Sequence, residues 1–106
     1  MKFANIENEV INNVMNVEID EFFITNESIK QIRNILNLDG KSIDELRAIR
    51  NTIVRTIAEM RDKAFEENNY ECFRNLSTKM SGITCAIDGV IWENSGAVFK
   101  KNIKKY

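Results

Sequence analysis

Carboxylates are the side chains of this sequence whose spacing could do chemistry. Glu18 and Glu21 are three residues apart, and so are Glu59 and Asp62. Two acids at this spacing project from one face of a helix and can together hold a Mg²⁺ ion, which prefers oxygen ligands. A bound Mg²⁺ ion could activate a water molecule or polarise a phosphate group.

The two acidic pairs resemble the paired acidic motifs of the all-α nucleotide pyrophosphohydrolases, which implies Mg²⁺-dependent cleavage of a nucleotide. The sequence around the second pair favours another interpretation. Glu59 and Asp62 point away from the apolar positions of their segment and have basic neighbours, which is typical of a solvated helix face. We therefore rank this enzyme third among the functions and expect no metal ion and no cofactor.

The residue types missing from the sequence exclude several kinds of catalysis. There is no His, so the commonest general base and the commonest zinc ligand are absent. Serine or cysteine nucleophiles activated by His are excluded for the same reason. The four glycines form no phosphate-binding loop. We therefore expect no catalytic residues and a protein that is not an enzyme.

A strip of basic and apolar side chains is the strongest binding feature. On a helix its members lie within about 60° of one another, beside the apolar stripe. They are Arg47, Arg50, Val54, Arg61 and Phe65, and we call them the arginine strip. Arginine among aromatic and aliphatic side chains is typical of protein interfaces, and it binds carboxylates or phosphates with two hydrogen bonds. The alternative is that the arginine stems cover the core edge and pair with the acidic N-terminal segment.

The C-terminal part of the chain adds further binding candidates. Trp92 lies off the main stripe of its helix, so it could anchor a partner or close the core against the N-terminal helix. Residues 97–106 form a basic tail. The tail could bind phosphates or an acidic protein surface through Lys100, Lys101, Lys104 and Lys105. The alternative is a frayed tail that only adds solubility.

The elements that must position these side chains are helices. Ser42 and Glu45 have the spacing of a capping box, which begins a long helix with apolar residues at spacings of three and four. A polar break then separates this helix from a second one with a matching stripe. The sequence therefore predicts an antiparallel helical hairpin of residues 43–66 and 70–92. We expect Gly96 to end the second helix.

Shorter helices are expected before the hairpin, at residues 3–16 and 27–37. Residues 17–24 could be helical or extended, because their apolar residues fit either period. A chain of 106 residues forms one domain, so we predict a single all-α domain built on the hairpin.

The second hairpin helix also carries a face of small residues. Thr78, Gly82, Cys85 and Gly89 lie within about 60° of one another. Two glycines inside a helix cost about 1 kcal/mol each relative to alanine, so they indicate close packing. We predict a homodimer through this face, with Gly82 and Gly89 near its axis; the alternative partner is the N-terminal helix.

Cys72 and Cys85 are too far apart on one helix, about 20 Å, to form a disulfide with each other. We expect two buried free thiols. An intermolecular disulfide is the alternative.

Charge and composition narrow the setting of the protein. The net charge of −1 argues against a general nucleic-acid coat protein. Residues 1–30 are acidic, with two lysines against six carboxylates, whereas the C-terminal tail is basic. No apolar run reaches the roughly 20 residues of a membrane span, and no secretory signal is present. We therefore expect a cytoplasmic protein that does not bind membranes.

Taken together, these features predict a small non-enzymatic helical protein that binds a macromolecular partner, most readily a protein, and inhibits or regulates it. Small helical inhibitors of this kind are common among the accessory, anti-defence and immunity proteins of phages and mobile elements. The alternative is a binding protein for a small anionic ligand, such as a nucleotide, held by arginines at a helix or subunit interface.

Overall fold

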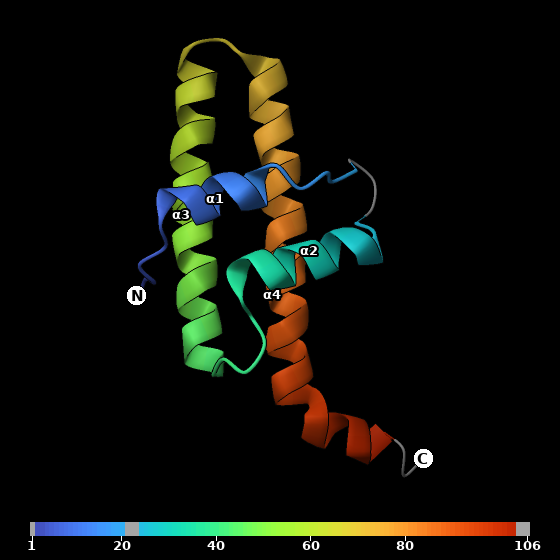
Figure 1. The fold of residues 1–106 in the computed structure, drawn as a ribbon. Coiled ribbons are helices and arrows are strands. Elements are labelled where there is room, and N and C mark those ends of the chain that lie inside the picture. The colour runs from blue at the N-terminus through green and yellow to red at the C-terminus, as the bar shows by residue number, and fades with distance from the viewer. Residues whose placement is uncertain (1, 21–23, 104–106) are drawn as a thin grey trace.

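Two long antiparallel helices, α3 (Ile43–Glu66) and α4 (Tyr70–Ile103), lie side by side and form the base of the fold (Figure 1). A computed structural model describes residues 2–20 and 24–103, with side chains through Ser95. These residues contain four helices and no strand, so the predicted all-α fold and its helical hairpin are confirmed. No helix within the described residues is long and apolar enough to cross a membrane.

Local hydrogen bonds explain where the hairpin helices begin. The Ser42 hydroxyl accepts the amide N–H of Glu45 at 3.1 Å, and the Glu45 carboxylate accepts the amide N–H of Ser42 at 3.1 Å. This is the predicted capping box. Between the helices Asn68 adopts the left-handed conformation, with φ of 59°, and the Asn69 side chain accepts the amide N–H of Cys72 at the start of α4. The turn is therefore short and fixed.

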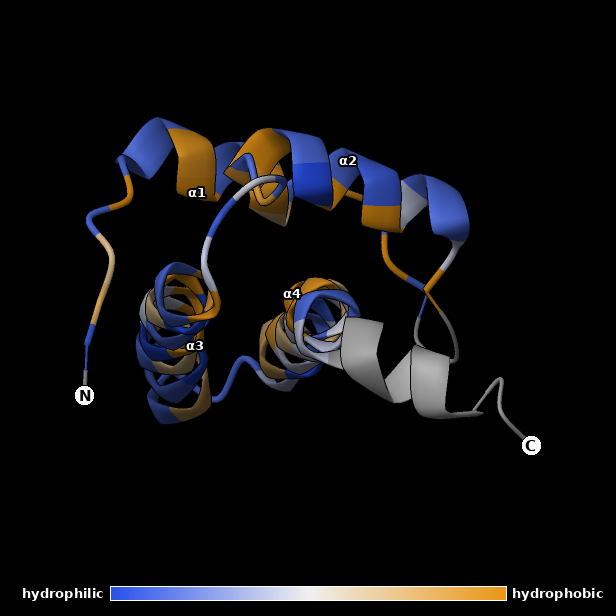
Figure 2. Ribbon diagram, turned by 90° about the horizontal axis from the view of Figure 1, so that it is seen from below, coloured by the Kyte–Doolittle hydropathy of each residue, from blue (hydrophilic) through white to orange (hydrophobic). Residues whose placement is uncertain are grey.

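A second layer covers one face of the hairpin. It consists of α1 (Asn8–Met15) and α2 (Asn26–Leu36), which run across α3 and α4 (Figures 1 and 2). Buried apolar residues of this layer, such as Val14 and Ile32, belong to one core with those of the hairpin. The largest fully buried side chains are Val14, Ile32, Leu38, Leu46, Ile53, Ile57, Ile83 and Ile87.

Helix α1 is shorter than predicted, because the chain before it is bound to α3 in an extended form. The amide N–H of Ala4 donates to the carbonyl of Ala48 and to the hydroxyl of Thr52, and Thr52 is 4% exposed. These bonds satisfy the backbone of Ala4 without a helix. The second predicted helix agrees with α2, whose start is capped by Thr25 and whose end is marked by the left-handed Asn37.

Residues 17–20, which we call the strap, follow α1 and are neither helix nor strand. Hydrogen bonds attach the backbone of the strap to α4 and to α2. The Lys79 ammonium donates to the carbonyl of Val17, and the Ser28 hydroxyl donates to the carbonyl of Glu18 at 2.7 Å. Partial burial lowers the pKa of Lys79, although Glu18 opposes this shift. The remainder of the segment predicted as helical or extended includes residues 21–23, which lie outside the described residues.

Two details of the predicted hairpin are wrong. Helix α4 does not end at Gly96 but continues to Ile103. A glycine costs about 1 kcal/mol in a helix, which does not by itself end one. Met60 continues the spacing of three and four that predicts the apolar stripe of α3, yet it is 42% exposed, because α1 and α2 do not reach the tip of the hairpin (Figure 1).

Candidate functional site

The arginine strip lies on the face of the hairpin that is turned away from α1 and α2. The N-terminal segment contacts α3 through Thr52, whose hydroxyl is bonded to the backbone of Ala4. At 100° per residue, Arg61 lies about 180° from Thr52 around the axis of α3, and Val54 lies about 160° from it. We call this surface the outer face; in Figure 2 it is the side of α3 and α4 away from the second layer.

An ion pair joins the two helices on the outer face. Nε of Arg50 donates to Oδ1 of Asp88 at 2.7 Å. Both side chains are partly exposed, so the pair contributes at most about 1 kcal/mol to stability. Because Asp88 belongs to α4, the interpretation that the strip pairs with the acidic N-terminal segment is wrong for Arg50.

An aromatic cluster occupies the outer face near the hairpin tip. The ring centre of Phe65 lies 5.7 Å from that of Phe73 and 5.9 Å from that of Tyr70. The Arg61 guanidinium lies 5.5 Å from the ring centre of Phe73, a cation–π contact. Nε of Arg61 is buried and has no hydrogen-bond partner among the described residues. Phe65 and Tyr70 are each 56% exposed, so this cluster is open to contact.

Trp92 and Arg47 lie at the other end of the outer face. Trp92 is one helical turn beyond Asp88, and because α3 and α4 are antiparallel this places it near the level of Arg47. Arg47 is exposed and forms no ion pair within the described part of the chain. Trp92 is 58% exposed, so it does not close the core against the N-terminal helix.

The predicted binding residues therefore share one face but do not converge on one point. Arg47 and Arg61 are fourteen residues apart, or about 21 Å along α3. Val54 lies halfway between them and is half-buried. The strip is thus part of an extended surface and not the lining of a pocket for one small molecule.

Two further residues of the outer face, Asp88 and Phe73, were not predicted as site residues. The register of the hairpin could have identified them. Arg50 and Asp88 are each 19 residues from Asn69 in the turn, and Phe65 and Phe73 are each four residues from it. A short turn fixes this antiparallel pairing, so the turn position alone predicts which residues of α4 lie opposite the strip.

The small-residue face is not one open surface. Gly82 is buried, and a Cβ atom built on it would lie 2.6 Å from Cγ2 of Ile19 in the strap. Thr78 is half-buried, whereas Cys85 and Gly89 are exposed, and a Cβ atom on Gly89 would meet nothing within 4 Å. The glycine that indicated close packing is therefore explained within the chain at Gly82 but not at Gly89.

Both cysteines are free thiols. Cys72 is half-buried and Cys85 is exposed, so the prediction of two buried thiols is wrong for Cys85. On α4 its side chain is turned away from the buried residues that face α3 and the second layer.

The structure describes three of the four carboxylates in the two acidic pairs. Glu59 and Asp62 are exposed on α3, and Glu18 lies in the strap, whereas Glu21 lies outside the described residues. Over the part of the chain that the structure describes, no group of three or more His, Cys, Asp or Glu residues could hold a metal ion.

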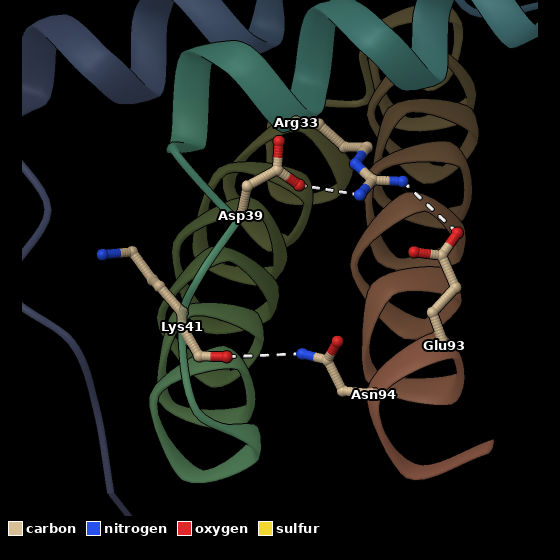
Figure 3. Close-up of polar contacts among 5 residues, drawn as sticks. All are labelled: Arg33, Asp39, Lys41, Glu93 and Asn94. Carbon is tan, nitrogen blue, oxygen red and sulfur yellow. Dashed lines mark hydrogen bonds and ion pairs between the residues drawn. The ribbon is translucent and has the colours of Figure 1, made fainter. Parts of the chain in front are cut away.

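A second charged cluster fastens α2 to α4 (Figure 3). Arg33 donates to Asp39 at 2.7 Å and to Glu93 at 3.3 Å. The hydrogen bond with Asp39 is the main cause of a raised pKa of Arg33, and both carboxylates add to it. Nearby, the Asn94 amide donates to the carbonyl of Lys41 at 3.3 Å. In contrast to Arg47 and Arg61, Arg33 is paired with carboxylates of the same chain.

The basic tail is only partly described. The backbone of Lys100 and Lys101 belongs to α4, whereas Lys104 and Lys105 lie outside the described residues. Binding of phosphates or of an acidic surface by the tail stays a prediction.

Comparisons with known proteins provide no relative from which a function could be transferred. The functional argument therefore depends on the surfaces of this chain. No protein-family model matches it, and neither a curated protein nor a solved structure matches it.

Proposed function

We propose that this protein is a non-enzymatic interaction protein that binds a partner protein through the outer face of its hairpin. The observation that carries the proposal is the two-layer arrangement. Helices α1 and α2 cover one face of α3 and α4, and the face with the arginine strip stays in solvent. Because α1 and α2 cover only one face of the hairpin, the outer face is accessible to a second molecule.

The side chains of the outer face support a protein partner. Residues that dominate binding energy at protein interfaces are most often Trp, Tyr and Arg. Tyr70 is 56% exposed near the hairpin tip, and Trp92 is 58% exposed near the opposite end of the outer face. Arg61 lies near the same end as Tyr70, and Arg47 lies near the level of Trp92. Contact of aromatic rings with water is unfavourable in free energy. Burial of these rings against a partner surface would therefore favour binding.

The charge of the outer face favours an acidic partner surface. Arg50 is already paired with Asp88, but Arg47 has no carboxylate partner within the described residues. Arg61 likewise forms no ion pair there. A carboxylate of the partner could accept from either guanidinium with two hydrogen bonds. Opposite charges would also speed association and make it sensitive to salt.

A small anionic ligand such as a nucleotide is less well supported. Arg47 and Arg61 are separated by about 21 Å along α3. A single nucleotide bound near one of them would therefore not reach the other. A helix or an extended surface of a partner protein is long enough to contact both.

The consequence for the partner would be inhibition or regulation. Covering a surface needs no catalytic residues, and it blocks whatever that surface does. The absence of His and the exposed outer face would also fit an accessory protein of a phage or mobile element, with a role against host defence or in immunity.

A capture experiment tests the proposal. The tagged protein would be incubated with a bacterial lysate, and retained proteins would be identified by mass spectrometry. The double variant Arg47→Glu/Arg61→Glu should lose a partner that the wild type retains. The control variant Lys30→Glu/Lys63→Glu makes the same change in net charge at two exposed residues outside the strip, and it should retain the partner.

Circular dichroism must first show that both double variants are folded. The proposal is wrong if the strip variant retains the partner as well as the control does. It is also wrong if only a small molecule, such as a nucleotide, co-purifies in stoichiometric amount and no protein does.

A further inference from the structure

A pocket of about 470 Å³ lies on the other side of α3 from the arginine strip. It is formed by the extended N-terminal segment and Val10 of α1, by the last turn of α2 and the connection that follows it, and by the first turns of α3. Most of its lining is apolar. These lining residues are Ala4, Ile6, Val10, Ile35, Leu36, Ala48 and Ile49. The volume lies within the range of about 300–1,000 Å³ that is usual for small-molecule sites.

The charged groups at the pocket are mainly negative. Glu7 and Glu45 line it, and Lys41 is the one cation among its lining residues. Hydrogen bonds from Ser42 are the main cause of a lowered pKa of Glu45, so this carboxylate stays ionised at neutral pH. The ammonium of Lys41 is directed away from α4 (Figure 3), and its charge lowers the pKa of Glu45 further. Glu7 has no ion pair within the described residues.

The end of α2 adds to the negative potential. The carbonyl groups of a last helical turn carry a partial negative charge, and residues Ile35 and Leu36 of that turn line the pocket. Asn37, the left-handed residue that follows Leu36 at the end of α2, also lines the pocket. An anion would thus meet two carboxylates and a helix C-terminus against the single ammonium group of Lys41, so the net charge at the pocket favours a cation.

We infer that this pocket binds a small amphipathic cation, with an apolar body the size of a short alkyl chain or one aromatic ring and a single ammonium group. The apolar body would lie against Val10, Ile35 and Ala48, and the ammonium group would lie at the rim near Glu7. This site is independent of the partner-binding face, because it is formed on the side of α3 that the N-terminal segment covers.

Titration with hexylamine, followed by amide chemical shifts, tests the inference. Hexylamine should shift the amide signals of Val10, Ile35 and Ala48. Hexanoate, which has the same chain length and the opposite charge, should bind about tenfold more weakly or not at all. The site is wrong if hexanoate binds as well as hexylamine, or if hexylamine leaves these three signals unchanged.

Two variants and a control locate the charge and the apolar body. Glu7→Gln should weaken hexylamine binding about threefold, since it removes one carboxylate near the ammonium group. Its side chain does not cap α1, so the fold should persist. Glu67→Gln removes a carboxylate about 27 Å further along α3 from Ile49 and should leave binding unchanged. Equal effects of the two variants would overturn the assignment.

Ala48→Phe would fill the pocket and should abolish hexylamine binding while the helical circular dichroism persists. If this variant does not fold, the comparison of hexylamine with hexanoate on the wild-type protein still decides the result. Arg61→Glu on the outer face should not change hexylamine binding, so a failure of this site and a failure of the proposed function can be told apart.

Discussion

At the scale of single residues, Gly82 is a position where the strap packs closely against α4. The side chain of Ile19 occupies the space that a Cβ atom of residue 82 would need, at 2.6 Å from Cγ2 and 2.8 Å from Cδ1. The freedom of Ile19 is restricted, because Lys79 and Ser28 donate hydrogen bonds to the carbonyls of Val17 and Glu18, the two residues before it. This contact explains Gly82 within one chain, without the predicted dimer.

Substitution of the two glycines of α4 should have opposite effects. Gly82→Ala should destabilise the protein by up to about 2 kcal/mol, since overpacking costs more than the gain in helix propensity. Gly89→Ala should stabilise it by about 1 kcal/mol, because that position is open and only the propensity gain remains. Urea unfolding measures both, and in an Ile19→Ala background Gly82→Ala should lose its cost. A Gly82→Ala variant as stable as the wild type would contradict the close contact.

Arg61 combines a cost in stability with a proposed role in binding. Its buried Nε lacks an acceptor among the described residues, which costs about 1–3 kcal/mol, whereas its contact with Phe73 contributes about 0.5–1 kcal/mol. Arg61→Met keeps the apolar stem, so it should raise the free energy of unfolding by about 1 kcal/mol and weaken partner binding. Thermal and urea unfolding check the first effect; a clear loss of stability would show that the guanidinium is satisfied after all.

The sequence pattern predicted which residues of the strip share one side of α3, but it did not predict what surrounds each of them. Helical spacing is sufficient to place Arg47, Val54 and Arg61 on one side of α3, because the helix is regular. It does not tell which side the second layer covers. Nor could it show that Asp88 pairs with Arg50, since that contact depends on the register between two helices.

At the scale of elements, the hairpin could be predicted because each of its signals is local. The capping box, the apolar stripes and the polar break all act within a few residues of where they occur. The N-terminal part was less predictable. Residues 4–7 have apolar spacing that fits a helix, but hydrogen bonds from Ala4 to Ala48 and Thr52 on α3 hold the chain extended. Such contacts between distant residues leave no periodic signal.

The capping box makes the start of α3 sensitive to acid. Hydrogen bonds from Ser42, and then the charge of Lys41, lower the pKa of Glu45 from its ordinary value. The folded state therefore binds this proton less readily than the unfolded state, so the stabilisation is present at neutral pH and is lost as the pH falls through the folded pKa.

Glu45→Gln provides the measurement, because glutamine can keep the capping box but does not titrate. The wild-type protein should be the more stable of the two at neutral pH. This advantage should shrink as the pH falls from about 6 to about 3, as followed by melting temperature. A difference between the two proteins that does not depend on pH would contradict the role of the ionised carboxylate.

At the scale of the whole molecule, the two layers leave the tip and the outer face of the hairpin in solvent (Figures 1 and 2). This asymmetry could not be read from the sequence, because helical spacing does not tell which side of the hairpin the second layer covers. The aromatic side chains of Phe65, Tyr70 and Trp92 are exposed, whereas the buried residues of the same helices are aliphatic, as at Ile53 and Ile83.

The predicted homodimer also belongs to the scale of the whole molecule. A dimer contact would use only the exposed part of the small-residue face. Gly82 is covered by Ile19, so Cys85 and Gly89 are the residues left to meet a second copy. Gly89→Leu should convert a dimer into a folded monomer, as measured by analytical ultracentrifugation. A wild-type protein that is monomeric at high micromolar concentration would show that the dimer prediction is wrong.

The most direct measurement for the proposed binding face is site-specific photo-crosslinking. The photoreactive residue p-benzoylphenylalanine would be placed at Val54, at the centre of the arginine strip, or at Asn12, which is exposed on α1 in the covering layer. If the outer face binds the partner, irradiation in a bacterial lysate should produce a crosslinked protein with the Val54 variant, and none with the Asn12 variant. A crosslink at Asn12 without one at Val54 would contradict the assignment of the outer face as the binding surface.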